Sequence, residues 1–131
     1  MAELHNPPSL AKPRGYSHAA SGRGRVVALA GQIGWDENAR LVSKELAPQF
    51  ERALANLVVA LASARAKPED LICLRIFVTD KKEYLTAIKE IGAAYRTHLG
   101  KHFPAMSLVE VADLLEEGAL VEIEGLAVVN D

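Results

Sequence analysis

Two stretches near the carboxyl terminus alternate between apolar and polar residues. Residues 103–111 and 120–127 both have the two-residue period of a strand that packs one face on a core. In the second stretch one parity is entirely apolar and consists of Val121, Ile123, Gly125 and Ala127. The other parity carries the carboxylates of Glu122 and Glu124. The pattern predicts strands whose second face is either solvated or used for a function.

The period changes to that of a helix from Leu46 onward. Apolar residues then recur every three or four positions and form one stripe, made of Phe50, Ala53, Leu54, Leu57, Val58, Leu61 and Ala62. Pro48 suits the first turn of a helix, and Pro68 closes the segment. We therefore expect a helix that packs this stripe against a sheet.

A strand and a second helix are expected next. Residues 71–79 alternate, with one set expected in the core, namely Ile72, Leu74, Ile76 and Val78. The other set is Cys73, Arg75, Phe77 and Thr79. Asp80, with Glu83 three residues later, has the form of a capping box and predicts the start of a helix. The apolar stripe of this helix is Tyr84, Ile88, Ile91, Tyr95 and Leu99, and Gly100 and Pro104 supply its end.

The amino-terminal part of the chain begins with a segment rich in proline. Residues 1–15 are expected to form an extended lead-in, and residues 5–15 are expected to hold no regular structure because they contain three prolines. Residues 16–20 and 26–30 flank the sequence Ser-Gly-Arg-Gly, which predicts a hairpin of two short antiparallel strands. Gly31 and Gly34 bracket the end of the second strand, where they form either a simple turn or a close approach to a ligand.

These elements predict an α+β domain with the order β-β-α-β-α-β-β and two helices on one face of the sheet. The opposite face is expected to mix apolar and charged side chains, namely Met106, Leu108, Phe77, Leu126, Arg75, Glu110, Glu122 and Glu124. Such a face is too apolar for water and too charged for a closed core. We expect it to contact other copies of the chain.

Composition narrows the class of protein further. The 131 residues suit one domain, 1–131, and the balance of 15 basic and 17 acidic residues gives no basic field for nucleic acid. A single cysteine, Cys73, excludes an internal disulfide and Cys-based zinc sites. His98 and His102 have helical spacing but flank Gly100, so no metal is expected. Without a signal-like start, the chain is expected to be cytoplasmic and to have no membrane partner.

Several short motifs together resemble the RidA/YjgF family of imine and enamine deaminases, which is also called the L-PSP endoribonuclease family. They are Gly15-Tyr16-Ser17-His18, Ala30-Gly31-Gln32-Ile33, residues 49–57 with Ala53 and Asn56, Pro68-Glu69-Asp70, Phe77-Val78-Thr79-Asp80, Phe103-Pro104-Ala105, Val109-Glu110-Val111 and Val121-Glu122-Ile123-Glu124. The resemblance implies a chorismate-mutase-like fold of the bacillus type, a homotrimer, and clefts between neighbouring subunits.

The family hydrolyses reactive 2-imino and 2-enamino acids to 2-keto acids and ammonia without a metal or organic cofactor. By resemblance, Tyr16 would line the cleft, Gly31 would offer its backbone to the substrate, and Glu122 would be catalytic by orienting water. Two structural alternatives stay open. Tyr16 could serve packing alone, and Glu122 could serve only as the ion-pair partner of Arg75.

One departure from the family pattern concerns the substrate carboxylate. Deaminating members have an arginine after Phe-Pro-Ala, and Met106 occupies that position here, followed by Ser107. Losing a charge-assisted pair would cost about 1.5–3 kcal/mol, so short 2-imino acids should bind poorly. Arg75 is the first candidate for a replacement cation; the others lie near matched motifs and are Arg14, His18 and His102.

Three functions remain open at this point. Met106 could accommodate a longer enamine, such as 2-aminomuconate, because methionine adapts to irregular apolar shapes. Alternatively, the chain could be a trimer that binds a small metabolite or a partner without catalysis. A ribonuclease is a weaker hypothesis, because the sequence has no basic groove with interleaved aromatic residues.

Overall fold

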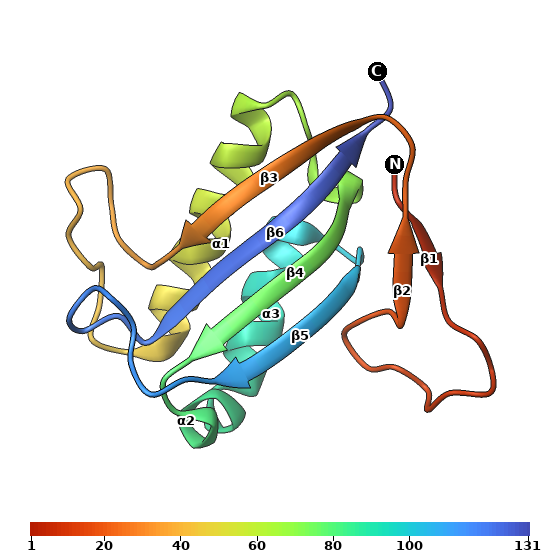
Figure 1. Cartoon of the computed structure of the whole chain (residues 1–131). Coiled ribbons are helices and arrows are strands. Elements are labelled where there is room, and N and C mark those ends of the chain that lie inside the picture. The colour runs from red at the N-terminus through yellow and green to blue at the C-terminus, as the bar shows by residue number, and fades with distance from the viewer.

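The structure, a computed structural model, describes all 131 residues. Its central sheet has four strands. The strands are β3 (Arg25–Gln32), β4 (Leu71–Val78), β5 (Ala105–Glu110) and β6 (Val121–Val129), in the order β3-β6-β4-β5 (Figure 1). β6 is antiparallel to β3 and β4, whereas β4 and β5 are parallel. A parallel pair needs a crossover connection, and the helical segment between β4 and β5 provides it.

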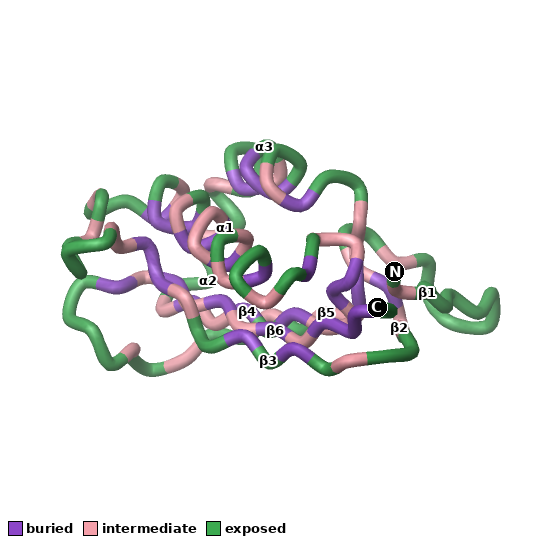
Figure 2. Tube along the Cα trace, turned by 90° about the horizontal axis from the view of Figure 1, so that it is seen from above, coloured by how far each residue is buried: buried purple, intermediate pink, exposed green.

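One layer of helices covers one face of this sheet, as Figure 2 shows from above. The helices are α1 (Leu46–Ser63), α2 (Lys81–Thr86) and α3 (Ile88–Leu99), with a short 3₁₀ turn η1 (Pro68–Asp70). The core between the layers includes Phe50, Leu54, Leu57, Leu61, Leu74, Ile76, Val121 and Ile123. The predicted α+β class, the first helix and the core face of β6 are confirmed. No helix has the length and apolarity that a bilayer span requires.

The second helix begins where predicted but is broken in the middle. The Asp80 carboxylate accepts hydrogen bonds from the backbone amides of Lys82 (2.9 Å) and Glu83 (3.3 Å), which confirms it as the N-cap. Ala87 then ends α2 and begins a separate α3. The break divides the predicted stripe between two helices that both pack on α1, because the ring of Tyr84 on α2 lies 6.3 Å from that of Phe50 on α1, and α3 packs along α1.

The predictions for the amino terminus differ in outcome. Residues 6–15 contain no helix or strand, as predicted for the segment rich in proline, but His5 ends a short strand, β1 (Glu3–His5), which pairs with β2 (Ala19–Ser21) in a separate two-stranded sheet. The predicted hairpin is absent, since β2 pairs with β1 and β3 pairs with β6. The prolines occupy the loop between β1 and β2, where they disturb no strand. Gly24 has φ +128°, and a side chain there would clash with the carbonyl of Val129.

The predicted composition of the open sheet face is only partly right. Phe77, Leu126, Arg75, Glu122 and Glu124 have the parity that turns away from the helices. Three residues of β5 do not, and they are Met106, Leu108 and Glu110. Their register partners are the buried core residues of β4, Leu74, Ile76 and Val78, so they point to the helix side. Alternation separates two sets of side chains but does not say which set of an edge strand faces inward.

β4 deviates from strict alternation at its start. Its pairing with β6 is irregular between Leu71 and Cys73. As a result Leu71 is fully buried, and Ile72, which alternation assigns to the core, is only half-buried. An extra residue in one strand shifts its side chains to the other face, which the sequence pattern does not reveal.

Candidate functional site

A groove of about 800 Å³ lies on the helix side of the sheet, between β5 and helices α2 and α3. Eleven of its sixteen lining residues are hydrophobic. The sheet contributes Ile76, Met106 and Leu108. The helices contribute Phe50, Tyr84, Leu85, Ile88, Ile91 and Tyr95. The groove is therefore an apolar site next to an edge strand.

The loop that carries Tyr16 is fixed to one end of this groove. The buried Ser17 donates its backbone N–H to the carbonyl of Pro104 (3.0 Å) and its hydroxyl to the carbonyl of Phe103 (2.6 Å). Tyr16 consequently lines the groove, with its ring edge-on to that of His18 at 5.4 Å. On the other side Tyr95 stacks on Phe103, with ring centroids 5.2 Å apart. This end of the groove is thus a rigid aromatic frame.

Two tyrosines in the groove wall are held in their neutral form. Burial raises the pKa of Tyr95 strongly and that of Tyr84 as well. The Tyr95 hydroxyl donates to the carbonyl of His102 at 2.7 Å, which leaves its ring as apolar wall. Neither phenol is suited to act as a base at neutral pH.

A second cluster of candidate residues lies on the open face, where β3 ends. The register of β3 against β6 is irregular between Leu29 and Gln32, so Ala30 and Gly31 form a bulge in which regular pairing is interrupted. A side chain on Gly31 would lie 2.7 Å from Oε2 of Glu122. The half-buried carboxylate of Glu122 therefore sits directly over the exposed backbone of Gly31.

The site residues predicted from the sequence fall into three groups within one chain. Tyr16 and Met106 share the groove at the β5 edge. Gly31 on the edge strand β3 and Glu122 on the neighbouring β6 lie together, and β4 separates this pair from β5. Arg75 and Ser107 are register partners, and both are exposed on the open face. A single chain therefore does not bring all of the candidates together.

The proposed pairing of Glu122 with Arg75 does not occur in the structure. Phe77 lies opposite Glu122, and Glu124 lies opposite Arg75. None of the four ion pairs of the chain involves Arg75 or Glu122. Glu122 is thus available for a role other than a salt bridge.

The candidate cations differ in how they are placed. Arg75 lies on the sheet face opposite to Met106, so within one chain it does not reach the groove. A ring nitrogen of His18 lies 2.7 Å from the carbonyl of Ala11, and one of His102 lies 2.7 Å from that of Leu71. Only Arg14, of the cations considered from the sequence, lines the groove.

Two further cations of the groove were not identified from the sequence, Lys81 and Arg96. Gly92, one turn before Arg96, was the available signal, because a small residue at this spacing leaves room for a long side chain. The structure contains no group of three or more histidine, cysteine, aspartate or glutamate side chains that could bind a metal ion.

Comparison with known proteins connects these features to a family. The family model described as Endoribonuclease L-PSP matches residues 7–129. The crystal structure of YyfB from Yersinia pestis, described as a protein of unknown function of the conserved Rid family, is 31% identical with a TM-score of 0.87 and 98% of each chain covered. The structure of RidA from a Psychrobacter species is 27% identical, with a TM-score of 0.69, over 91% of this chain and 92% of that one.

A relative from yeast bears on the compartment. The mitochondrial protein Mmf1 of Saccharomyces cerevisiae is 27% identical over 108 residues, which are 82% of this chain and 69% of the yeast protein. One relative is therefore mitochondrial, whereas the sequence predicts a cytoplasmic protein. Family membership alone does not determine the compartment of this chain.

Proposed function

Because the chain belongs to the L-PSP endoribonuclease family, which is also known as the RidA/YjgF family, we propose that it hydrolyses a reactive imine or enamine. The observation that carries this proposal is the division of the candidate residues between two edges of one sheet. The Tyr16 and Met106 cluster lies at the β5 edge, and the Gly31 and Glu122 cluster lies near the β3 edge. Two incomplete clusters on opposite edges suit an enzyme whose cleft is completed by another copy.

A closed ring of identical chains would complete the cleft. In a head-to-tail ring, the β3 edge of each copy lies beside the β5 edge of its neighbour, and a cyclic trimer closes with three such contacts. Gly31 and Glu122 of one copy would then face Tyr16 and Met106 of the next. The exposed apolar residues of the open face, which include Val26 and Val109, would be covered in such a ring.

The chemistry requires water, a base and a group that binds the nitrogen of the substrate. Glu122 would orient a water molecule for addition to the carbon of the C=N bond and would accept its proton. The bulge at Gly31 would offer backbone groups to the reacting centre, and no side chain at Gly31 would block the substrate from them. The nitrogen would take up the proton that Glu122 accepted, which gives a carbinolamine. The hydroxyl proton of the carbinolamine would then pass through Glu122 to the amine as the C–N bond breaks, which releases a carbonyl compound and ammonia.

The test of this proposal is release of ammonia and keto acid from 2-imino acids generated in situ by an amino-acid oxidase. Glu122→Gln should lower the rate by about two to four powers of ten, which is typical for removal of a general base. Glu124→Gln is the matched control, since Glu124 is on the same strand and face but lies opposite Arg75 rather than near Gly31. Equal rates for the natural protein and Glu122→Gln would contradict the proposal.

Met106 determines which substrate to expect. By resemblance, the family arginine at this position grips a carboxylate, and Met106→Arg should therefore increase turnover of short 2-imino acids such as 2-iminopropionate. If the natural protein hydrolyses no imine or enamine, including 2-aminomuconate, while Met106→Arg does, the native role is binding of a metabolite. That outcome would favour a trimer that binds a metabolite without catalysis. The only observation behind this alternative is Met106 in place of the family arginine.

RNA is the less favoured substrate despite the ribonuclease in the family description. The groove is mainly apolar, and the chain has a net charge of −2, whereas RNA binding relies on positive charge along the phosphate backbone. We therefore favour a small molecule in the cleft.

A further inference from the structure

The groove beside β5 contains positive charges and no negative one. Its charged lining residues are Arg14, Lys81 and Arg96, and no aspartate or glutamate lines it. The four ion pairs of the chain involve other residues, and none of these three side chains donates a hydrogen bond within the protein. The groove thus presents unneutralised cations next to an apolar surface.

Two of the cations belong to the same end of the groove. Arg96 lines the groove from the last turn of α3, the end of the helix that leads to Phe103, and the residue is exposed. Arg14 lies two residues before Tyr16, in the segment that Ser17 fixes to the backbone of Phe103 and Pro104. This end, defined by Arg14, Arg96 and Phe103, is called the arginine end below.

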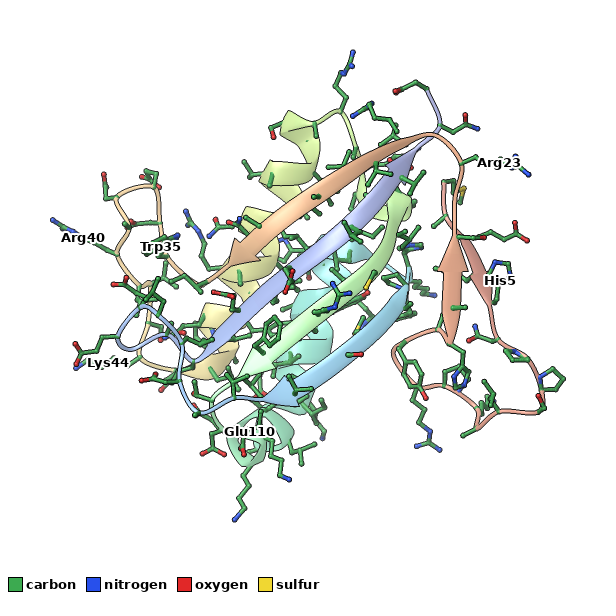
Figure 3. All side chains as sticks on the ribbon, in the orientation of Figure 1. His5, Arg23, Trp35, Arg40, Lys44 and Glu110 are labelled. Carbon is green, nitrogen blue, oxygen red and sulfur yellow. The ribbon has the colours of Figure 1, made fainter.

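Lys81 belongs to the opposite end of the groove. Its backbone N–H donates to the Glu110 carboxylate at 2.9 Å, which places a negative charge beside it. Glu110 marks the α2 end of β5 (Figure 3). The arginine end is therefore where an anionic group would be bound best.

Gly92 leaves space for the guanidinium of Arg96. A side chain at position 92 would lie 3.6 Å from Nη1 of Arg96, so the Arg96 side chain extends back along α3 by one turn. Arg96 also carries its donors in a planar fork that matches a carboxylate. Nη1 of Arg96 consequently lies beside Gly92 in the groove wall, although Arg96 is exposed to solvent.

The remaining surface of the groove is suited to hydrocarbon. Leu85 and Ile88 are 62% and 46% exposed at the rim, although both are large apolar residues. Met106 and Leu108 are half-buried on the floor. An apolar ligand would remove these side chains from water, which stabilises binding in proportion to the buried area.

We infer that Arg96, assisted by Arg14, supplies the carboxylate-binding cation that position 106 lacks, and that the ligand is an apolar carboxylate. Under the proposed reaction, on which this assignment of a substrate rests, the substrate is a 2-imino or 2-enamino acid with a large hydrocarbon side chain. Its carboxylate lies at the arginine end, and its hydrocarbon lies over Met106 and Leu108.

Calorimetric titration of the full chain with octanoate and with 1-octanol tests the binding step without turnover. Octanoate should bind at least about tenfold more tightly than the uncharged alcohol, because only octanoate gains a charge-assisted pair. Arg96→Gln should weaken octanoate binding about ten- to a hundredfold and leave octanol binding unchanged. Arg40→Gln is the control, since Arg40 lies on the loop before α1, away from β5 (Figure 3).

A second variant keeps the inference falsifiable if Arg96→Gln unfolds. Gly92→Glu places a carboxylate one turn from Arg96 on a helix that tolerates glutamate well, and it should abolish octanoate binding with the helix content unchanged. Equal affinity for octanoate and octanol, or full octanoate affinity in Arg96→Gln, would overturn the inference.

Binding and turnover separate this inference from the proposed function. If octanoate binds through Arg96 but no imine is hydrolysed, the cation assignment holds and the proposed reaction is wrong. If imines are hydrolysed while octanoate neither binds nor inhibits, the proposed reaction holds and the cation assignment is overturned.

Discussion

The lack of a side chain at Gly31 sets the position of the Glu122 carboxylate. A Cβ atom at this position would lie 2.7 Å from Oε2 of Glu122, which is closer than non-bonded atoms approach. Gly31→Ala should therefore displace the carboxylate and lower imine turnover about tenfold or more, since small misplacements of a catalytic group are costly. The measurement is the rate of ammonia release.

Stability is the control for this variant. Gly31 is exposed and does not have a positive φ, so alanine introduces no backbone strain and the urea midpoint should change little. Unchanged turnover in Gly31→Ala would show that the Glu122 carboxylate is not used where the structure places it.

Tyr95 makes the stability of the chain sensitive to alkaline pH. In an unfolded chain a tyrosine ionises near pH ~10, but burial raises the pKa of Tyr95 in the folded chain. Above pH ~10 the folded state therefore binds more protons than the unfolded state, and the free energy of unfolding falls as pH rises. Tyr95→Phe should make this fall less steep.

Urea unfolding at pH 7 and at pH ~10.5 measures both parts of the effect. At pH 7 Tyr95→Phe should lose about 1 kcal/mol, because the carbonyl of His102 loses its donor. Thr97→Val is the control, since it removes a hydroxyl hydrogen bond from the exposed side of the same helix without removing a titrating group. If the free energy of unfolding depended on pH in the same way in the natural protein and in Tyr95→Phe, Tyr95 would not be the group that makes stability sensitive to alkaline pH.

Individual site residues differed in how well the sequence located them. Glu122 was placed on the correct face by strand parity, because β6 pairs regularly with β4 from Val121 to Leu126. Arg96 was not found, since its position in the groove depends on how α3 packs against the sheet. Met106 was predicted to be a site residue by resemblance, but it was assigned to the open face, whereas its register partner Leu74 is in the core.

The N-cap of α2 supports one wall of the groove. Asp80 accepts hydrogen bonds from two backbone amides that otherwise have no partner in the helix. Asp80→Ala should lower the free energy of unfolding by about 1 kcal/mol. It should also destabilise the groove wall that α2 forms with Tyr84 and Leu85. Urea denaturation measures this loss.

Glu117→Ala is a suitable control for the N-cap variant. Glu117 is an exposed acid in the loop before β6, and its side chain makes no hydrogen bond or ion pair. Equal midpoints for Asp80→Ala and Glu117→Ala would mean that the cap contributes nothing to stability.

Elements were predictable from the sequence where one local signal determined them. The start of α1 and the cap of α2 depend on residues within a few positions of each other, and both were located correctly. The partner of β2 was not predictable, because Ser-Gly-Arg-Gly suits a hairpin while the long loop to β1 gives no local signal. The inward face of β5 also depended on a distant strand, β4.

The assembly predicted for the whole molecule can be tested through the open face of the sheet. Val109 on β5 is 46% exposed and lies opposite Phe77, as expected for an apolar surface that meets another copy. The natural protein should sediment with the mass of three chains. Val109→Lys should reduce this mass, because burial of an ammonium group in an apolar contact is unfavourable.

Val59→Lys provides a matched control for the assembly. Val59 is 69% exposed but belongs to α1 in the helix layer, so the same substitution should leave the mass unchanged (Figure 2). A natural protein that sediments as one or two chains would contradict the predicted trimer.

Mixing two inactive variants tests whether neighbouring copies share a cleft. Tyr16→Ala removes a residue of the groove, and Glu122→Gln removes the carboxylate on β6, next to the β3 edge of the sheet. If each cleft takes Tyr16 from one copy and Glu122 from the next, a mixed trimer of either composition contains one cleft with both residues intact. Random exchange at equal amounts should then restore about one quarter of all clefts in a cyclic trimer.

The recovered activity distinguishes this arrangement from a site within one chain. If Tyr16 and Glu122 of the same chain acted together, each mutant chain would carry one defect and no mixture would contain an intact site. Turnover in the refolded mixture, with none in either variant alone, would therefore require that the two edges of the sheet meet between copies. The opposite result is a mixture that contains mixed trimers, as shown by their mass, but stays inactive. Tyr16 would then not belong to the cleft that contains Glu122 of the next copy, and its role would be packing in the aromatic frame around Phe103.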